Sequence, residues 1–327
     1  MNLLITGGAG YIGSHTVRKL KQAGHDIIIF DNLSAGHKKS VENFNLIIGD
    51  LANKNLLKKV FAQNNFDAVI HFAGLIEAGE SMIDPKRFFE NNVVCGMNLL
   101  EVMLEYNVKK IVFSSSAAVY GESQRIPIEE TDQKNPTNIY GLTKLIFEQI
   151  LDSYDSAYGL KSISLRYFNA AGADPSGEIG EHHKTETHLI PLVLEAALGK
   201  RESIKIFGTD YSTPDGTCIR DYIHVCDLAD AHVLALAYLK KNNQSDKFNL
   251  GNERGSSVLE VIEMTKKITG INFPVIQDAK RIGDPIILCA SSKKAQEVLG
   301  WKPKFGSIED MIKTAWNWHK NNPNGFE

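Results

Sequence analysis

The chain has little of what characterises secreted scaffolds, disordered segments and repeat proteins. Its few cysteines lie far apart and form no C-x-x-C pair, so a disulfide framework is unexpected in a chain of 327 residues. No stretch of biased composition and no short internal period occurs, which excludes disordered and repeat architectures. We expect reduced, mostly buried thiols at Cys95, Cys218, Cys226 and Cys289.

Strong charge of one sign and long apolar runs are also missing. A formal net charge of −3 gives no overall field that would attract a nucleic-acid backbone or an anionic membrane. The first apolar run, residues 3–5, stops at Thr6-Gly7, so neither a signal peptide nor a membrane span is predicted. We therefore expect a cytoplasmic protein with no nucleic-acid and no membrane partner, in which any phosphate group is bound locally.

The first half of the chain does contain the rhythm of a parallel sheet. Helical stretches alternate with apolar runs at residues 2–5, 26–30, 46–48, 68–72, 110–113 and 162–166. Such runs are apolar on both faces because helices cover both sides of a doubly wound sheet, and ligands bind beyond the carboxyl ends of its strands. The predicted fold class is α/β, with a doubly wound, Rossmann-like parallel sheet.

The alternation loosens after residue 170. We expect a loop at 172–186, a helix at 189–198, a strand at 204–207, and a helix at 223–239 that feeds a strand at 247–250, which could return to the main sheet. Helices are also predicted at 257–268 and 307–318, the latter opening with the capping pair Ser307 and Asp310. These boundaries predict a main domain, residues 1–166 with 223–250 returning to it, and a smaller mixed α/β C-terminal lobe, residues 167–222 and 251–327, for the substrate.

A glycine-rich loop comes directly after the first strand. The segment TGGAGYIG places Gly7, Gly10 and Gly13 between that strand and the next helix. Glycines let the backbone turn tightly and approach a pyrophosphate, which free N–H groups and the helix dipole stabilise. Asp31 ends the second strand about 20 residues on, where a ribose-binding acid belongs. Because its carboxylate would accept hydrogen bonds from ribose hydroxyls and repel a 2′-phosphate, we predict NAD rather than NADP.

Three further strand ends meet the same edge of the sheet. Asp50-Leu51 comes after the third strand and Phe72-Ala73-Gly74 after the fourth, well placed for the adenine ring and the pyrophosphate. The segment 113–116 ends the fifth strand and delivers the hydroxyls of Ser114 and Ser116 to the cofactor.

Tyr140 and Lys144 are the candidate catalytic pair. They lie four residues apart in a stretch of helical character, which places both side chains on one face. A second Y-x-x-x-K pair, Tyr106 and Lys110, fails on context because Lys110 begins an expected strand. An adjacent ammonium and a cationic nicotinamide would lower the pKa of Tyr140, so that it takes a proton from a substrate hydroxyl. Ser116 would hydrogen-bond the same oxygen, and Lys144 would also hold the nicotinamide ribose.

Three histidines raise the question of a metal. His182-His183 and His188 are close in sequence, but no second cluster of thiolate, imidazole or carboxylate ligands accompanies them at metal-site spacing. We therefore expect a solvated loop there and no metal.

Several motifs together resemble the UDP-glucose 4-epimerases, a family of extended short-chain dehydrogenases/reductases. The likeness spans nearly the whole chain and rests on TGGAGYIGSH, FDNLSAGH, HFAG, FSSSAAVYG, the Tyr140–Lys144 pair, RYFNAAGADPSGEIGE and GTCIRDYIHVCDLADAH. The first motifs are shared by all extended short-chain dehydrogenases and indicate only fold and cofactor. The last two are much more specific to nucleotide-sugar epimerases.

The resemblance also implies which residues contact the ligands. Those implied for NAD are Tyr11, Ile12, Asp31, Asn32, Asp50, Leu51, Phe72, Ala73, Gly74, Asn91 and Phe168. Those implied for the UDP-sugar are Asn169, Leu189, Phe207, Arg220, Tyr222, Arg281 and Asp284. Guanidinium groups suit a diphosphate because they offer paired donors and permanent charge.

The implied reaction interconverts UDP-galactose and UDP-glucose. Tyr140 removes the 4′-hydroxyl proton while hydride leaves C4′, the resulting 4-ketose rotates on its UDP anchor, and the returning hydride inverts C4. NAD is regenerated in each cycle and should stay bound. The resemblance also implies a homodimer, formed through helices near residues 87–105 and 140–158.

Three positions depart from a common pattern of the family. Ile76 stands where many relatives have a lysine near the cofactor, so one charge contact is missing. His188 replaces an asparagine but still offers a donor to the substrate. Leu288 lies beside the sugar's 2-substituent and is smaller than tyrosine, which leaves N-acetylated hexosamines open as substrates, with UDP-pentoses and UDP-uronates as further alternatives.

Two other functions compete with epimerisation. A nucleotide-sugar 4,6-dehydratase needs an extra acid and base, which its family carries as an Asp-Glu pair after the serine/threonine turn, where this chain has Ala117-Ala118. A non-catalytic dinucleotide sensor would usually lack the tyrosine and lysine. Tyr140, Lys144 and Ser116 argue against it.

Overall fold

Parallel strands form the main sheet of the molecule. The computed structural model describes residues 1–123, 125–280 and 285–327. The strands of the main sheet are β1 (Asn2–Thr6), β2 (Asp26–Asp31), β3 (Asn45–Ile48), β4 (Ala68–His71), β5 (Lys110–Ser116), β6 (Lys161–Tyr167) and β10 (Asp246–Leu250). Within the described residues their order is β10-β6-β5-β4-β1-β2-β3, so the chain moves outward from β1 in both directions. The strand order reverses between β4 and β1, and ligands are expected at this point, beyond the carboxyl ends of the strands.

Helices cover both faces of this sheet. The first face packs against α1 (Tyr11–Gln22) and α8 (Val225–Asn242), and the second against α2 (Lys54–Gln63), α5 (Cys95–Glu105) and α6 (Ile139–Tyr158). Leu3 and Ile5 belong to the core on the first face and Leu4 to the core on the second. Both cores are buried, which is why each strand reads as a continuous apolar run.

Short helical elements lie in the connections between the strands and long helices of this main sheet. They are η1 (Lys38–Val41), α3 (Ala78–Ile83), α4 (Pro85–Phe89), η2 (Glu90–Val94) and η3 (Ala117–Val119).

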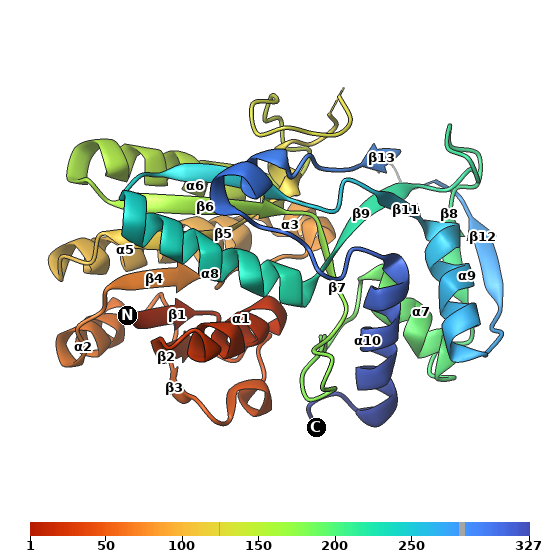
Figure 1. Cartoon of the computed structure of the whole chain (residues 1–327), viewed down its shortest axis with the longest axis horizontal. Coiled ribbons are helices and arrows are strands. Elements are labelled where there is room, and N and C mark those ends of the chain that lie inside the picture. The colour runs from red at the N-terminus through yellow and green to blue at the C-terminus, as the bar shows by residue number, and fades with distance from the viewer. Residues whose placement is uncertain (124, 281–284) are drawn as a thin grey trace.

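The C-terminal part forms a smaller α/β layer on the right of Figure 1. Its strands are β7 (Asn169–Ala171), β8 (Ile204–Phe207), β9 (Ile219–His224), β11 (Gly255–Ser257), β12 (Val275–Asp278) and β13 (Ile287–Leu288). Its helices are α7 (Leu189–Ala197), α9 (Val258–Thr269) and α10 (Ile308–Asn321). The short helix η4 (Ala295–Leu299) packs instead on the core of the main sheet. Strand β9 pairs with β7, β11 and β13, and β8 pairs with β12. The helices α7, α9 and α10 stand together at the far end of the molecule from the N-terminus.

Most expected elements are found within a residue or two of their predicted bounds. The strand expected at 247–250 does return to the main sheet, where β10 pairs with β6. Ser307 caps α10 by accepting a hydrogen bond from the amide of Asp310. The cysteines are free and buried, as expected. None of the helices in the described part of the chain is both long and apolar enough to cross a bilayer.

One helix begins two residues later in the structure than predicted. The prediction of a helix over 223–239 is wrong at its start, because Ile223 and His224 belong to β9 and the helix begins at Val225. Pairing of Ile223 with Ala170 of β7 outweighs the local helical pattern. His224 then caps α8 by accepting a hydrogen bond from the amide of Cys226.

Candidate active site

The glycine loop packs too tightly against its neighbours to carry side chains. Gly7 has a φ of +73°, and a Cβ there would lie 2.4 Å from the amide nitrogen of Ala73, just beyond β4. A Cβ on Gly13 would lie 2.4 Å from the carbonyl oxygen of Gly7. The loop therefore brings the start of α1 against the ends of β1 and β4, with backbone N–H groups facing the ligand edge.

Asp31 is held at the end of β2 by backbone donors. Its carboxylate accepts hydrogen bonds from the amides of Ala9 at 2.9 Å and Leu33 at 2.8 Å. Burial raises the pKa of Asp31, and these hydrogen bonds oppose the shift. Beside it, the Asn32 amide donates a 2.7 Å hydrogen bond to Asp50. The two strand ends predicted to hold the adenosine are thus joined.

A cavity of about 340 Å³ lies at the carboxyl ends of the main strands. All residues predicted to contact the cofactor line it: Gly7, Gly10, Tyr11, Ile12, Gly13, Asp31, Asn32, Asp50, Leu51, Phe72, Ala73, Gly74, Asn91, Ser114, Tyr140, Lys144 and Phe168. The volume is that of a small-molecule site. The structure therefore brings together the strand ends that were predicted separately.

The predicted catalytic residues meet in the same cavity. Asn138 caps α6, which places Tyr140 and Lys144 one turn apart at its start. Ser116, at the end of β5, lines the same cavity, and its hydroxyl acts to lower the pKa of Tyr140. The Lys144 ammonium donates a 2.8 Å hydrogen bond to the carbonyl oxygen of Ser114 and lies 5.8 Å from the centre of the Tyr140 ring.

The other Y-x-x-x-K pair does not form such a site. Tyr106 caps the end of α5, and Lys110 begins β5. The two therefore do not share a helix face, as predicted.

Burial dominates the electrostatics of the pair. It raises the pKa of Tyr140, the Ser116 hydroxyl opposes the shift, and Glu77 adds to it. It lowers the pKa of Lys144 to about 8, against the charge of Glu148. In the chain alone the pKa of Tyr140 is thus raised, not lowered as we expected from Lys144, because desolvation penalises the phenolate.

Two residues that the sequence analysis missed hold this arrangement in place. Asn92 is buried in η2, accepts a 2.8 Å hydrogen bond from the amide of Leu75, and donates to the Thr143 hydroxyl at 3.1 Å. Ser81 accepts a hydrogen bond from the amide of Tyr140 at 3.1 Å. In the sequence, Asn92 is a polar residue in a largely apolar helical stretch. Such a residue, once buried, must hydrogen-bond within the protein, and this pattern could have pointed to Asn92.

Only some of the residues predicted to contact the substrate line this cavity. Ser116, Tyr140, Asn169 and His188 line the cavity with the cofactor residues. Of the other described residues, Leu189, Phe207, Arg220 and Leu288 lie outside the lining of that cavity, and Leu288 packs against the buried cluster that includes Phe168. Arg281 and Asp284 lie outside the described residues.

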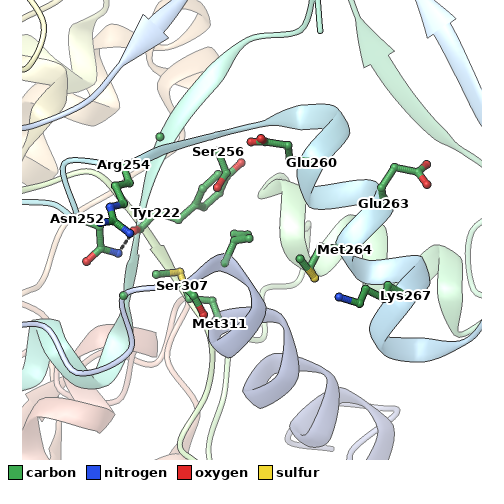
Figure 2. Close-up of a pocket in the computed structure, with 13 residues that line it drawn as sticks. Tyr222, Asn252, Arg254, Ser256, Glu260, Glu263, Met264, Lys267, Ser307 and Met311 are labelled. Atoms are coloured by element: carbon green, nitrogen blue, oxygen red, sulfur yellow. Dashed lines mark hydrogen bonds between the residues drawn. The ribbon is translucent and has the colours of Figure 1, made fainter. Parts of the chain in front are cut away.

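Tyr222 lines a different cavity, shown in Figure 2. This cavity measures about 560 Å³ and lies between β9, β11, α9 and α10. The carbonyl oxygen of Tyr222 accepts a 2.5 Å hydrogen bond from Asn252, and the charged side chains of Glu263 and Lys267 border the opposite side. Tyr222 is therefore not brought beside the predicted catalytic residues.

The histidine loop is only partly solvated, because Lys184, Thr185 and Thr187 are exposed while its two carboxylates turn inward. The side chains of His183 and His188 are 17% and 42% exposed, while those of Glu181 and Glu186 are only 5% and 7% exposed. These four residues gather with their ligand atoms within 4.8 Å of one another. The expectation of no metal rested on the lack of a second ligand cluster outside the segment. The groups that accompany the histidines are instead the two carboxylates of the same segment, Glu181 and Glu186.

The cluster is strongly coupled electrostatically. Burial acts to lower the pKa of His188, but Glu181 and Glu186 outweigh it and raise the pKa well above its ordinary value. Burial acts to raise the pKa of Glu186, and hydrogen bonds with His183 and His188 lower it instead. Glu181, His183 and His188 also line the main cavity.

Comparison with known proteins finds relatives along the whole chain. Residues 3–251 match the model of the NAD dependent epimerase/dehydratase family. A UDP-glucose 4-epimerase of Halalkalibacterium halodurans is 53% identical over 326 residues, covering 100% of this chain and 98% of that protein. A crystal structure of a UDP-glucose 4-epimerase matches with a TM-score of 0.98 and 50% identity over 100% of both chains. The structure of a UDP-glucose 4-epimerase from Bifidobacterium longum in complex with NAD+ and UDP matches with a TM-score of 0.94 and 41% identity over 99% of this chain and 100% of that chain.

Proposed function

Because the chain belongs to the NAD dependent epimerase/dehydratase family, we propose that it interconverts UDP-galactose and UDP-glucose by inverting C4 of the sugar, with NAD as its cofactor. The observation that carries this proposal is the meeting of Ser116, Tyr140 and Lys144 in the cavity that the glycine loop borders. The family resemblance and the fold class predicted from the motifs are confirmed by the full-length relatives.

The residues of the cavity fit a dinucleotide. Gly7 and Gly13 leave no room for a Cβ, which is the close backbone approach that a pyrophosphate needs. The N–H groups at the start of α1 hold the pyrophosphate, Asp31 binds the adenosine ribose, and Lys144 binds the nicotinamide ribose. When bound, NAD supplies reversible hydride transfer at C4 of the hexose.

Tyr140 handles the proton of the 4-hydroxyl. Ser116 lines the same cavity and hydrogen-bonds the same substrate oxygen. Lys144, whose pKa is lowered only to about 8, is largely protonated at neutral pH and favours the phenolate form of Tyr140. A sugar tethered only through its UDP group can present either face to this one tyrosine, so a single proton-transfer group serves both epimers.

The UDP-sugar extends from the cavity into the C-terminal part. Asn169 and His188 line the cavity and contact the nucleotide sugar there. Leu189, Phe207 and Arg220, which lie on α7, β8 and β9, contact the rest of the nucleotide, with Arg220 on the diphosphate. The roles of Tyr222, Arg281 and Asp284 are carried over from the family resemblance.

The residues directly after β5 disfavour dehydration. Ala117 and Ala118 occupy η3 next to Ser116. Neither methyl group can donate or accept the protons that elimination of water across C5 and C6 requires. The position of these alanines beside Ser116 therefore supports epimerisation over 4,6-dehydration.

The same proposal covers domain organisation, assembly and location. Residues 1–166 with 223–250 bind NAD, and residues 167–222 and 251–327 bind the UDP-sugar. Two copies pair through the helices at residues 87–105 and 140–158, where Val94 at the end of η2 and Tyr158 at the end of α6 are 53% and 52% exposed. The free, buried cysteines favour a reducing compartment, the cytoplasm.

The deciding experiment monitors the anomeric protons of UDP-galactose by NMR. The purified chain is incubated with UDP-galactose, first without and then with added NAD. UDP-glucose should appear, and its appearance without added NAD would mean that the cofactor is retained although Ile76 offers no charge to it. If UDP-galactose stays unchanged even with NAD, the proposal is wrong, and UDP-pentoses and UDP-uronates are tried next.

A further inference from the structure

The segment that joins β7 to α7 carries a compact group of two imidazoles and two carboxylates. Glu181 and Glu186 have side chains only 5% and 7% exposed, so both carboxylates are withdrawn from water. The Nδ1 atoms of His183 and His188 face them, and the two rings are 5.2 Å apart between centroids. One ligand atom from each residue lies within 4.8 Å of all the others.

The separations between these atoms are close to the edges of a metal coordination tetrahedron, and most are slightly shorter. The Nδ1 atom of His188 lies 2.9 Å from an oxygen of Glu181 and 3.1 Å from an oxygen of Glu186. The Nδ1 atom of His183 lies 3.6 Å from the same oxygen of Glu181 and 3.1 Å from the other oxygen of Glu186. Ligands bound to Zn²⁺ at about 2.0–2.2 Å in a tetrahedron are separated by about 3.3–3.6 Å, so small shifts would seat an ion among them.

We propose that Glu181, His183, Glu186 and His188 bind one divalent transition-metal ion of the Zn²⁺ class. Two imidazole nitrogens select such an ion over Ca²⁺ and Mg²⁺, which prefer six or more oxygen ligands. The two carboxylates neutralise the ion, so that the buried site carries no net charge. Both histidines use the same ring nitrogen, which leaves each Nε2 atom for an outer hydrogen bond.

The surroundings hold the ligands in place. An oxygen of Glu186 accepts hydrogen bonds from the amides of Thr187 and His188, each at 2.8 Å, which fixes its carboxylate at the start of α7. On the other side, His182 stacks on His37 and its carbonyl oxygen is hydrogen-bonded to that ring at 3.0 Å. The ligand-bearing segment is thus pinned at both of its ends.

The role of this ion is structural. Four protein ligands fill a tetrahedral shell and leave no open position for a substrate or water, as in other structural zinc sites. Because Glu181, His183 and His188 line the main cavity, the ion fastens one wall of that cavity to the start of α7. The inference goes beyond the proposed reaction and does not depend on it.

The test uses the full chain without an affinity tag, stripped with a chelator and titrated with ZnCl₂ by calorimetry. We expect one Zn²⁺ per chain, resistant to competition by excess Mg²⁺ or Ca²⁺. His183→Gln and Glu181→Gln should weaken binding by about 100-fold or more, since even outer-shell changes cost about 10–100-fold. His25→Gln is the matched control, because it removes an imidazole from the turn before β2, at the opposite end of the main strands from the four ligands.

Absence of Zn²⁺ binding to the wild-type chain would overturn the proposal, as would equal affinity in His183→Gln, Glu181→Gln and the wild type. A spectrum of the Co²⁺-loaded wild type decides the matter even if the variants fail to fold. Intense visible bands of a four-coordinate ion without a thiolate charge-transfer band support the site. A weak six-coordinate spectrum, or a thiolate band, contradicts it.

Discussion

A fully buried ion pair connects the helix of the catalytic residues to the sheet. Arg166 on β6 and Glu148 on α6 have side chains only 2% and 1% exposed and are joined by two hydrogen bonds of 2.5 and 2.9 Å. Ser115 donates to the same carboxylate at 2.6 Å, and Arg166 donates to the Tyr120 hydroxyl at 2.8 Å. The network fixes α6, and with it Tyr140, against the ends of β5 and β6.

Replacing Arg166 by Met tests this network. The substitution keeps most of the side-chain volume but leaves Glu148 buried with Ser115 as its remaining donor. Leaving one buried charge unpaired costs about 3–5 kcal/mol. With an unfolding entropy of about 2.1 cal/mol/K for each of the 327 residues, the melting temperature should fall by about 4–7 °C. The double variant Arg166→Met/Glu148→Leu should recover most of this loss, because no charge is then left behind.

Scanning calorimetry of the four proteins of this double-mutant cycle measures the effect. Arg125→Met is the control, since Arg125 forms its ion pairs with Glu129 and Asp132 at the surface, where such pairs contribute little. An unchanged melting temperature in Arg166→Met would refute the reasoning. A double variant less stable than the single one would refute it as well, because the penalty would then not come from the unpaired carboxylate.

Three further predictions concern catalysis, pH and substrate range. Tyr140→Phe should lower turnover by about 10²–10⁴-fold while NAD stays bound, because the ring remains and only the proton-transfer group is lost. The control, Tyr106→Phe, should leave turnover unchanged. Equal activity of Tyr140→Phe and the wild type in a steady-state assay would exclude Tyr140 as the proton carrier. Burial, aided by the charge of Lys144, lowers the pKa of His71 from 6.5 to about 3, so the unfolded chain binds a proton there that the folded chain does not. This contribution to stability is present above pH 6.5 and is lost toward pH 3 by about 1.4 kcal/mol per pH unit. His71→Gln should therefore flatten the pH dependence of the free energy of urea unfolding between about pH 7 and pH 5, and a slope equal to that of the wild type would argue against a neutral buried His71. The family resemblance implies that Leu288 lies beside the sugar's 2-substituent, where overpacking costs about 1–3 kcal/mol. On that basis Leu288→Tyr should reduce conversion of UDP-N-acetylgalactosamine about tenfold more than that of UDP-galactose. Equal slowing of both substrates in parallel NMR assays would contradict this placement.

The cofactor half of the site could be predicted from the sequence because parallel strands share one ligand edge. Gly7, Asp31 and Phe72 lie at the ends of three different strands, yet the doubly wound sheet must bring them together, and all three line one cavity. The helical spacing of Tyr140 and Lys144 likewise determined their common face. Local patterns were sufficient wherever a regular element carries the residue.

The rest depended on contacts between distant segments. The end of β9 reads as helix, and only its pairing with β7 makes Ile223 extended. The inward turn of Glu181 and Glu186 is set by the path of an irregular loop, which no periodicity encodes. The raised pKa of Tyr140 depends on how completely the folded chain buries it, a quantity that spacing does not give.

The most direct test of the central claim uses UDP-galactose carrying deuterium at C4 of the sugar. Hydride removal and return within one cavity, without exchange with water, should deliver UDP-glucose that keeps the deuterium at C4, as read by NMR and mass spectrometry. Loss of the label to solvent during conversion would contradict the account, because C4 would then be inverted through a carbanion that exchanges protons with water rather than by hydride transfer.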